Sequence, residues 1–296
     1  DEKSLQKIYD LKQYAPLHNT AEADVIKAFM KVLPGVPEVA VFDTSFHQTL
    51  DPVHYLYSLP YKYYEKYGAR KYGAHGTSVR YVSQKAAEIM KRDLKDLKLI
   101  VCHLGSGASV TAVKDGKSFD TSMGFSPMAG ITMSSRSGDV DPSLLAFVMK
   151  KENLDADQML KVLNNESGLL GISGISPDMR DLRGDMTKLE GEKKKRADLA
   201  RNIFINRIIR YVGAYTLEMG GLDGIAFTAG VGEHDFGVRE HVMDSLELLG
   251  LKPDSAANKE NATIITKPDS TIVGMVIPTN EELMIERDVV RVAGLK

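Results

Sequence analysis

Two apolar, strand-like runs in this chain each stop abruptly at a cluster of small residues rich in glycine. The first is residues 99–108, LIVCHLGSGA, and the second is residues 224–233, GIAFTAGVGE. Because glycine has no Cβ, backbone N–H groups in such turns can come close to a bulky anion. One turn of this kind is weak evidence for phosphate binding. Two in one α/β chain predict an enzyme that holds a nucleotide between two lobes and moves its terminal phosphate.

The composition is that of an ordinary globular enzyme. The 296 residues suffice for one large or two medium domains, and 43% are hydrophobic and 26% charged. The net charge of -2 predicts no general basic surface for nucleic acid. We find no apolar run near the roughly 20 residues that span a bilayer, no signal peptide and no zinc-type cluster of His and Cys. The one cysteine, Cys102, excludes an internal disulfide and fits a cytoplasmic location.

Hydrophobic periodicity predicts an α/β fold in which three strands are followed by helices and by two further strand–helix units. The dipeptide Asp115-Gly116 is typical of a type I′ hairpin turn, so the first three strands should be antiparallel. Thr77 or Ser78 is the expected N-cap of the first long helix. The expected strands are 39–42, 98–104, 109–113, 118–121, 222–228 and 271–277, and the expected helices are 77–95, 144–150, 156–163, 197–219 and 281–292, with a solvated charge run at 190–196 and loops at 16–19 and 52–72.

The two glycine turns differ in what surrounds them. His103–Gly107 joins two expected strands and matches neither a Walker loop nor a Rossmann fingerprint. It fits a hairpin that holds phosphate through backbone N–H groups, with a tight structural β-turn as the alternative. Ala229–Glu233 precedes a helix expected near Val238, whose N-terminus would favour an anion or the adenosine side of a nucleotide. A plain strand-to-helix connection is the alternative there.

Several polar side chains are candidates for phosphate chemistry. The Arg136 guanidinium is flanked by small residues and could fork onto phosphoryl oxygens, or pair with Asp139 or Asp141 in a structural salt bridge. His75 lies between glycines that would present its imidazole, although a lone histidine is usually not catalytic. Asp43 ends an expected strand and could orient a nucleophile or cap a loop.

A last acidic segment, Pro278–Glu282, ends a strand and opens the final helix. A carboxylate in it could hold Mg²⁺ through water, or simply favour the first turn of that helix.

Taken together, these segments resemble the acetate kinase family, which comprises acetate and propionate kinases, within the superfamily of sugar kinases, heat-shock ATPases and actin. The matching segments follow the family's order over nearly the whole chain: 41–49, 72–78, 101–109, 120–127, 135–142, 167–173, 178–180, 227–233 and 277–283. The resemblance implies an α/β fold with actin-like, ribonuclease H-like ATPase lobes. Residues 1–45 would be the remnant of an N-terminal lobe, 46–280 a complete C-terminal lobe for nucleotide binding and dimerisation, and 281–296 a closing helix that returns toward the N-terminal lobe.

The implied activity is a reversible, direct in-line transfer of a phosphoryl group from ATP to acetate, giving acetyl phosphate and ADP. It would require Mg²⁺, or Mn²⁺ in its place, in a cytoplasmic homodimer without nucleic-acid or membrane partners. By resemblance, Asp43 is the active-site acid, His75 and Arg136 stabilise the transferred phosphoryl group, and Glu281 binds the metal. The implied nucleotide site comprises His103, Leu104, Gly105, Ser106, Gly107, Asp178, Met179, Arg180, Gly230, Val231, Gly232, Glu233 and His234, and the implied acyl pocket comprises Leu17, Ala74 and Pro127.

Some positions depart from the family's pattern. Ser106 and His234 stand where Asn is usual, Ala74 where Phe is usual, and Val79 where a His is common. The family's N-terminal segment, with a further phosphate loop and a carboxylate-binding Arg, is absent, so the chain resembles the C-terminal part of the family. A propionate kinase, or a nucleotide-binding or dimerisation module without turnover, are the alternatives. A sugar kinase similar to glycerol kinase is disfavoured by Thr279–Glu282.

Overall fold

The computed structural model describes residues 1–11, 16–184 and 187–295. They form two compact units, one made of Asp1–Phe42 with Glu281–Lys296 and the other of Asp43–Asn280. The larger unit contains the sheet and both glycine turns.

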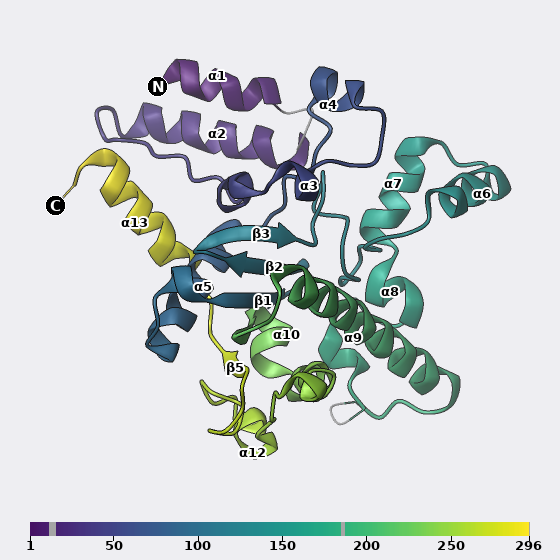
Figure 1. The fold of residues 1–296 in the computed structure, drawn as a ribbon. Helices are drawn as coiled ribbons and strands as arrows, with labels where there is room; N and C mark the ends of the chain where they lie inside the picture. The colour runs from purple at the N-terminus through teal and green to yellow at the C-terminus, as the bar shows by residue number, and fades with distance from the viewer. Residues whose placement is uncertain (12–15, 185–186, 296) are drawn as a thin grey trace. The chain divides into compact units, whose positions relative to one another are not determined.

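A five-stranded sheet in the order β3-β2-β1-β4-β5 forms the centre of the larger unit (Figure 1). Its antiparallel part is β1 (Lys98–Leu104), β2 (Ala108–Lys114) and β3 (Lys117–Thr121). β4 (Gly224–Thr228) and β5 (Val273–Val276) extend the sheet in parallel from β1. The predicted α/β class and the antiparallel arrangement of the first three strands are both confirmed.

The turn between β2 and β3 has the predicted chemistry. Asp115 has φ 54° and Gly116 has φ 73°, the left-handed pair that a type I′ turn requires. This turn matches the right-handed twist of the flanking strands, which is why so short a connection closes the hairpin.

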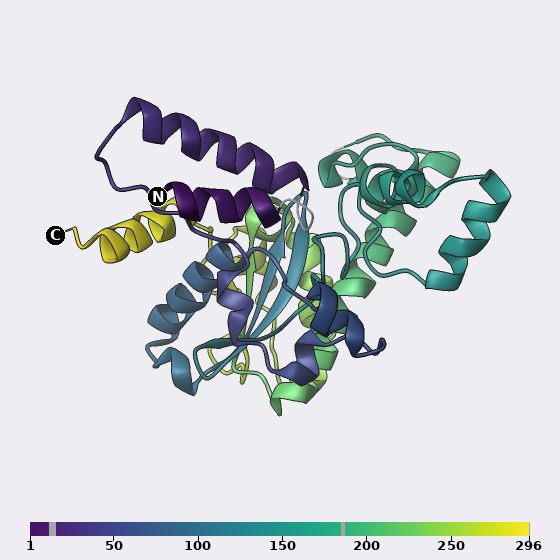
Figure 2. The same ribbon diagram turned by 90° about the horizontal axis from the view of Figure 1, so that it is seen from above.

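β1 separates two hydrophobic cores, because successive side chains of a strand point to opposite faces. Ile100, Cys102 and Leu104 are buried in the core that contains α9 (Gly191–Met219). Leu99 and Val101 are buried in the core that contains α5 (Gly76–Met90). One long helix therefore packs on each face of the sheet (Figure 2).

α9 is the central helix that the sequence predicts, but it begins earlier. The charge run 190–196 forms its solvated first turns, as expected, and Phe204, Ile208 and Val212 are buried. Leu199, which the apolar pattern places on the buried face, is 52% exposed.

The other helices of the larger unit surround this core. They are α3 (Pro52–Tyr55), α4 (Lys62–Tyr67), α6 (Pro142–Glu152), α7 (Ala156–Asn165), α8 (Gly168–Ser173), α10 (Ala229–His234), α11 (Phe236–Asp244) and α12 (Ser255–Lys259), with 3₁₀ turns at Ser45–Thr49, Leu94–Asp96, Met179–Leu182 and Glu247–Leu249. The segment 52–72 therefore contains two short helices, where the sequence predicts only a loop. α5 ends at Met90, before the predicted limit of 95, because Lys91 turns into the left-handed region with φ 52°.

The smaller unit consists of α1 (Glu2–Asp10), α2 (Pro16–Val32) and α13 (Glu281–Ala293). Leu5, Ile8 and Ala23 are its buried hydrophobic cluster. Two expectations are wrong here. The predicted loop at 16–19 is the start of α2, and the predicted strand at 39–42 belongs to no helix or strand, with Phe42 50% exposed. An apolar run forms a strand only where a neighbouring strand accepts its hydrogen bonds.

Candidate active site

The two glycine turns lie side by side at one end of the sheet, where β1 and β4 both finish. β1 and β4 are parallel neighbours that pair His103 with Thr228, so both turns leave the sheet at the same end. In the first turn, Gly105 N donates to Gly107 O at 3.1 Å. A Cβ placed on Gly105 would lie 3.6 Å from the Cβ of Ala229 in the second turn. The first turn is thus the predicted hairpin, and it touches the second.

The second turn is itself the start of a helix. α10 begins at Ala229, whose φ of 63° is left-handed, and the helix predicted near Val238 follows it as α11. Glu233 Oε1 accepts from Ala229 N at 2.8 Å and from Thr279 N at 3.4 Å. Gly232 packs tightly, since a Cβ there would lie 3.3 Å from the Phe227 carbonyl carbon, whereas nothing lies within 4 Å of a Cβ on Gly230.

His75 is presented by a strained backbone beside the first turn. The backbone φ of His75 is 60°. The His75 ring stacks on the His103 ring, with the ring centroids 4.0 Å apart. His75 Nδ1 lies 2.9 Å from Ser109 Oγ, and His103 Nδ1 lies 2.8 Å from Ser78 Oγ. Serine hydroxyls therefore fix the orientation of both rings.

Both imidazoles are neutral at physiological pH. Burial is the main cause, and it lowers the pKa of His75 to about 4, with the Arg136 charge and His47 acting in the same direction. Burial likewise lowers the pKa of His103 to about 3, with a further contribution from His75. Each ring is then a hydrogen-bonding group rather than a fixed positive charge.

Arg136 reaches the same point as His75. A Cβ placed on Gly107 would lie 3.3 Å from Arg136 Nη1 and 3.4 Å from His75 Nε2. The guanidinium is half-buried, and its hydrogen bonds to described residues go to the Pro127 carbonyl at 3.4 Å and the Met133 sulfur at 3.9 Å. A cation and a neutral imidazole thus converge beside the first glycine turn.

The alternative role of Arg136 in a structural salt bridge is not observed. Asp139 accepts from Gly130 N and from the Tyr211 hydroxyl, and Asp141 accepts from Ser143 N. Across the described residues, no carboxylate forms an ion pair with Arg136. A half-buried guanidinium without a counter-ion attracts an anionic ligand.

The backbone around Arg136 is fixed from two sides. Ser134 N donates to Ser106 O at 3.1 Å, which ties this loop to the first glycine turn. At the start of α8, Gly168 has φ 60°, and a Cβ there would lie 2.2 Å from Met133 O and 2.7 Å from Arg136 O. Only glycine allows this approach. The sequence motif 167–173 contained this residue, but its spacing gave no sign of the contact.

Asp43 caps the helix that follows His75. Its Oδ2 accepts from His75 N at 2.6 Å and its Oδ1 from Thr77 N at 3.2 Å. The predicted N-cap at Thr77 or Ser78 is wrong, because this carboxylate from a distant segment takes over the capping role. Of the roles foreseen for Asp43, capping is the one that the geometry displays, and its role as an active-site acid stays a prediction.

His47 is a site residue that sequence reasoning missed. It is buried, and its ring nitrogens lie 2.8 Å from Ser118 Oγ and 2.8 Å from the Ala74 carbonyl. It therefore holds the residue before His75. The pKa of His47 is lowered, mainly by burial. Its neighbours Phe46 and Gln48 gave no signal of its burial.

The remaining predicted residues lie apart from this convergence or outside its unit. The Asp178 carboxylate is engaged by the Arg180 guanidinium, Met179 is buried, and the Arg180 side chain is 75% exposed. Leu17 and Glu281 belong to the smaller unit, and the Leu17 side chain is outside the described residues. One further cluster, His54, Asp120 and Glu218, has ligand atoms within 4.8 Å of one another, but Lys71 already pairs with Asp120 and disfavours a cation.

The strand order is that of an actin-like ATPase fold, and an arginine that pairs with no described carboxylate lies beside its two glycine turns. The model of the acetokinase family matches residues 1–287. The acetate kinase of Lacticaseibacillus paracasei is 56% identical over 293 residues, which are 98% of this chain and 73% of that protein, and the acetate kinase of Bacillus subtilis is 53% identical over 294 residues. The chain belongs to the acetokinase family, and so to the phosphotransferases with a carboxyl group as acceptor.

Solved structures agree with this assignment. The acetate kinase of Porphyromonas gingivalis has a TM-score of 0.93 at 42% identity and matches 99% of this chain and 73% of its own. A propionate kinase from Francisella tularensis has a TM-score of 0.89 at 41% identity, over 96% of this chain and 72% of its own. In the described chain, we find no helix both long enough and apolar enough to cross a bilayer.

Proposed function

We propose that this site transfers the terminal phosphoryl group of ATP to acetate, reversibly, to give acetyl phosphate and ADP. The observation that carries the proposal is the convergence of Arg136 Nη1 and His75 Nε2 on Gly107, where no carboxylate of the described residues neutralises the guanidinium. Phosphoryl transfer needs positioning and positive charge more than covalent help from the protein.

In this mechanism, a carboxylate oxygen of acetate forms a bond to the terminal phosphorus while the bond from that phosphorus to the bridging oxygen of ADP breaks. Arg136 stabilises the charge that spreads over the equatorial oxygens. His75 is neutral, and in the tautomer whose Nδ1 accepts from the Ser109 hydroxyl, Nε2 carries the proton and donates one hydrogen bond to the same group. Asp43 is the proposed active-site acid and also holds the backbone of His75.

The two glycine turns, 103–107 and 230–234, are proposed to hold the nucleotide, together with Asp178–Arg180. Their adjacency at the same end of β1 and β4 supports this. Acetokinases use ATP or ADP with Mg²⁺, and the Glu281 carboxylate is the type of hard oxygen ligand that suits this ion. When bound, the ion would neutralise charge on the phosphate oxygens.

Leu17, Ala74 and Pro127 are the proposed acyl pocket. The Pro127 carbonyl lies 3.4 Å from Arg136 Nη1, and Ala74 precedes His75, which supports these two positions. Propionate is the second candidate substrate, because Ala74 leaves more room than the phenylalanine usual at that position. A cytoplasmic homodimer, formed through residues 46–280 as the C-terminal lobe, completes the proposal, and sedimentation as a well-behaved monomer would contradict the dimer.

The test is formation of acetyl phosphate from acetate and MgATP, trapped with hydroxylamine, alongside MgADP binding measured by calorimetry. We expect both, and Arg92→Ala serves as a control because the Arg92 side chain makes surface contacts, with Asp223 and the Asp96 carbonyl. Nucleotide binding without any acetyl or propionyl phosphate would favour a binding module. Absence of both would overturn the proposal.

A further inference from the structure

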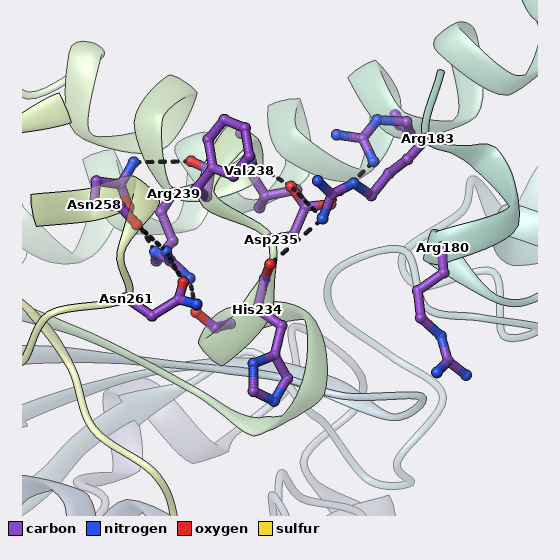
Figure 3. A network of polar contacts seen from close by, with 12 residues as sticks. Arg180, Arg183, His234, Asp235, Val238, Arg239, Asn258 and Asn261 are labelled. Atoms are coloured by element: carbon purple, nitrogen blue, oxygen red, sulfur yellow. Dashed lines mark hydrogen bonds and ion pairs between the residues drawn. The ribbon is translucent and has the colours of Figure 1, made fainter. Parts of the chain in front are cut away.

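A completely buried arginine lies beneath the second glycine turn. Arg239, on α11, has 0% exposure and ranks among the largest fully buried side chains of the described chain. Its Nη1 donates to Gly232 O at 2.9 Å, its Nε to Asn258 Oδ1 at 2.7 Å, and its Nη2 to Asn258 O and Asn261 Oδ1, both at 2.6 Å (Figure 3). All of these acceptors are neutral oxygens.

The nearest acidic group serves other partners. Asp235 caps α11 through Val238 N at 3.1 Å and pairs with Arg201 at 3.0 Å. In the part of the chain that the structure describes, no carboxylate pairs with Arg239. Burial lowers the pKa of Arg239 to about 10, so the guanidinium remains charged at neutral pH.

Burying a charge of this kind costs free energy, so a gain in stability alone does not account for it. An apolar side chain of similar volume often replaces buried ionic groups at no loss, or with a gain. What an apolar side chain cannot do is direct hydrogen bonds to chosen oxygens in a fixed planar geometry. The contacts of Arg239 therefore point to a positional role.

Those contacts join the second turn to a distant segment. Gly232 lies in the turn, whereas Asn258 lies in α12 and Asn261 lies just after it. Two residues after Gly232, the His234 carbonyl accepts from Arg183 Nη1 at 3.4 Å. Two guanidinium groups thus hold carbonyls on either side of Glu233, and the His234 imidazole points away from the Arg239 cluster (Figure 3).

We infer that Arg239 is a positioning residue for the nucleotide: by holding the Gly232 carbonyl against Asn258 and Asn261, it fixes the second glycine turn in the conformation that receives ATP or ADP. The inference rests on the proposed function of that turn. Arg239 acts through the backbone of Gly232 and does not itself touch the ligand.

The experiment compares MgADP dissociation constants of Arg239→Met, Arg239→Lys and the unchanged chain by calorimetry. Met keeps most of the volume and removes every donor, so we expect its Kd to rise at least tenfold, with Lys in between. Val242→Ala is the matched control, because Val242 is fully buried on the same helix but has no donor that could hold a carbonyl of the turn. Its Kd should stay within twofold, although it too lowers the melting temperature.

Asn261→Gly covers the case in which Arg239→Met does not fold. Asn261 has φ 54°, so glycine keeps its backbone and removes one acceptor. We expect a rise of about threefold in Kd. A folded Arg239→Met with an unchanged Kd, or a Val242→Ala that weakens binding equally, overturns the inference.

Amide hydrogen exchange separates this inference from the proposed function. Without nucleotide, residues 230–234 should exchange faster in Arg239→Met than in Val242→Ala, and equal exchange counts against positioning. If the unchanged chain binds no MgADP while this difference in exchange is present, the proposal of a nucleotide site fails. The role of Arg239 in fixing the second glycine turn then still stands.

Discussion

The imidazole rings of His75 and His103 are stacked at 4.0 Å between centroids, with an angle of 21° between their planes. Two imidazolium ions at this separation would repel each other strongly, and within the described chain neither ring has a carboxylate against its nitrogens. The stack therefore requires neutral rings, and it couples the fold of the site to pH.

Stability should fall on mild acidification. The pKa values of His75 and His103 are about 4 and about 3 in the folded chain, below the ordinary 6.5. In the pH range between these values and 6.5, the unfolded chain therefore binds more protons than the folded chain. Stability then rises with pH through this window and is lost as pH falls from about 6.5 toward 4. Urea unfolding at pH 5 and pH 7 measures the difference. His103→Gln should reduce the slope of stability against pH, and an unchanged slope would contradict the assignment.

Arg136→Ala should lower turnover by on the order of 10³, with a smaller effect on nucleotide binding, because the guanidinium acts on charge that develops during transfer. His75→Ala should act in the same direction but less, since a neutral imidazole supplies one hydrogen bond. Hydroxamate assays and calorimetry on the same preparations provide the comparison. A variant that is mostly unfolded, while its folded fraction keeps full turnover, would favour a purely structural role.

Asp43→Asn should separate capping from catalysis. An amide oxygen can still accept from a backbone N–H, so the melting temperature should change little, whereas Asp43→Ala should cost about 1 kcal/mol. If the carboxylate works as the active-site acid, Asp43→Asn should still lose about 10²-fold in turnover. Full turnover with normal stability would leave Asp43 as a helix cap only.

Gly168→Ala should damage the Arg136 loop. The new methyl group would meet the Met133 and Arg136 carbonyls, and the left-handed φ of 60° adds strain, so we expect a loss of about 2 kcal/mol or more together with reduced turnover. Gly213→Ala in α9 is the control, since nothing lies within 4 Å of a Cβ there, and helix propensity predicts a gain of about 0.5–1 kcal/mol. Thermal melts distinguish the two. Equal stability in both variants would show that the close approach at Gly168 is unimportant.

Ala74→Phe should sharpen the preference for acetate over propionate. One methylene in an apolar pocket is worth about 1–3 kcal/mol, and a phenyl ring would take up the volume that the ethyl group needs. The measurement is the ratio of kcat/KM for acetate to that for propionate in the two forms. An unchanged ratio would mean that position 74 does not line the acyl pocket.

The sequence predicted what local chemistry determines. Asp115-Gly116 specifies its own turn, and the apolar run 98–104 and the glycines after it identify β1 and the first turn. The run 39–42 has the same local pattern, but a strand also needs a partner, and no local pattern reveals one. The prediction of the N-cap of α5 was wrong for a related reason, since the capping carboxylate is that of Asp43, in another segment.

Buried polar groups were the largest omission in the site. Arg239 lies in a polar stretch of α11 that looks solvent-exposed, and its acceptors at Asn258 and Asn261 are 19 and 22 residues away. His47 likewise acts through Ser118 and Ala74. Such contacts depend on tertiary packing, so periodicity and motif spacing cannot report them.

The parallel register that pairs His103 with Thr228 restricts how the chain can change in length. Side chains alternate along a strand, so one inserted or deleted residue in β1 or β4 would turn every later side chain of that strand to the opposite face. It would also carry one glycine turn away from the other, because the two leave the sheet together. Length changes should therefore be tolerated in exposed connections outside the sheet, and should be excluded from 99–107 and 224–232.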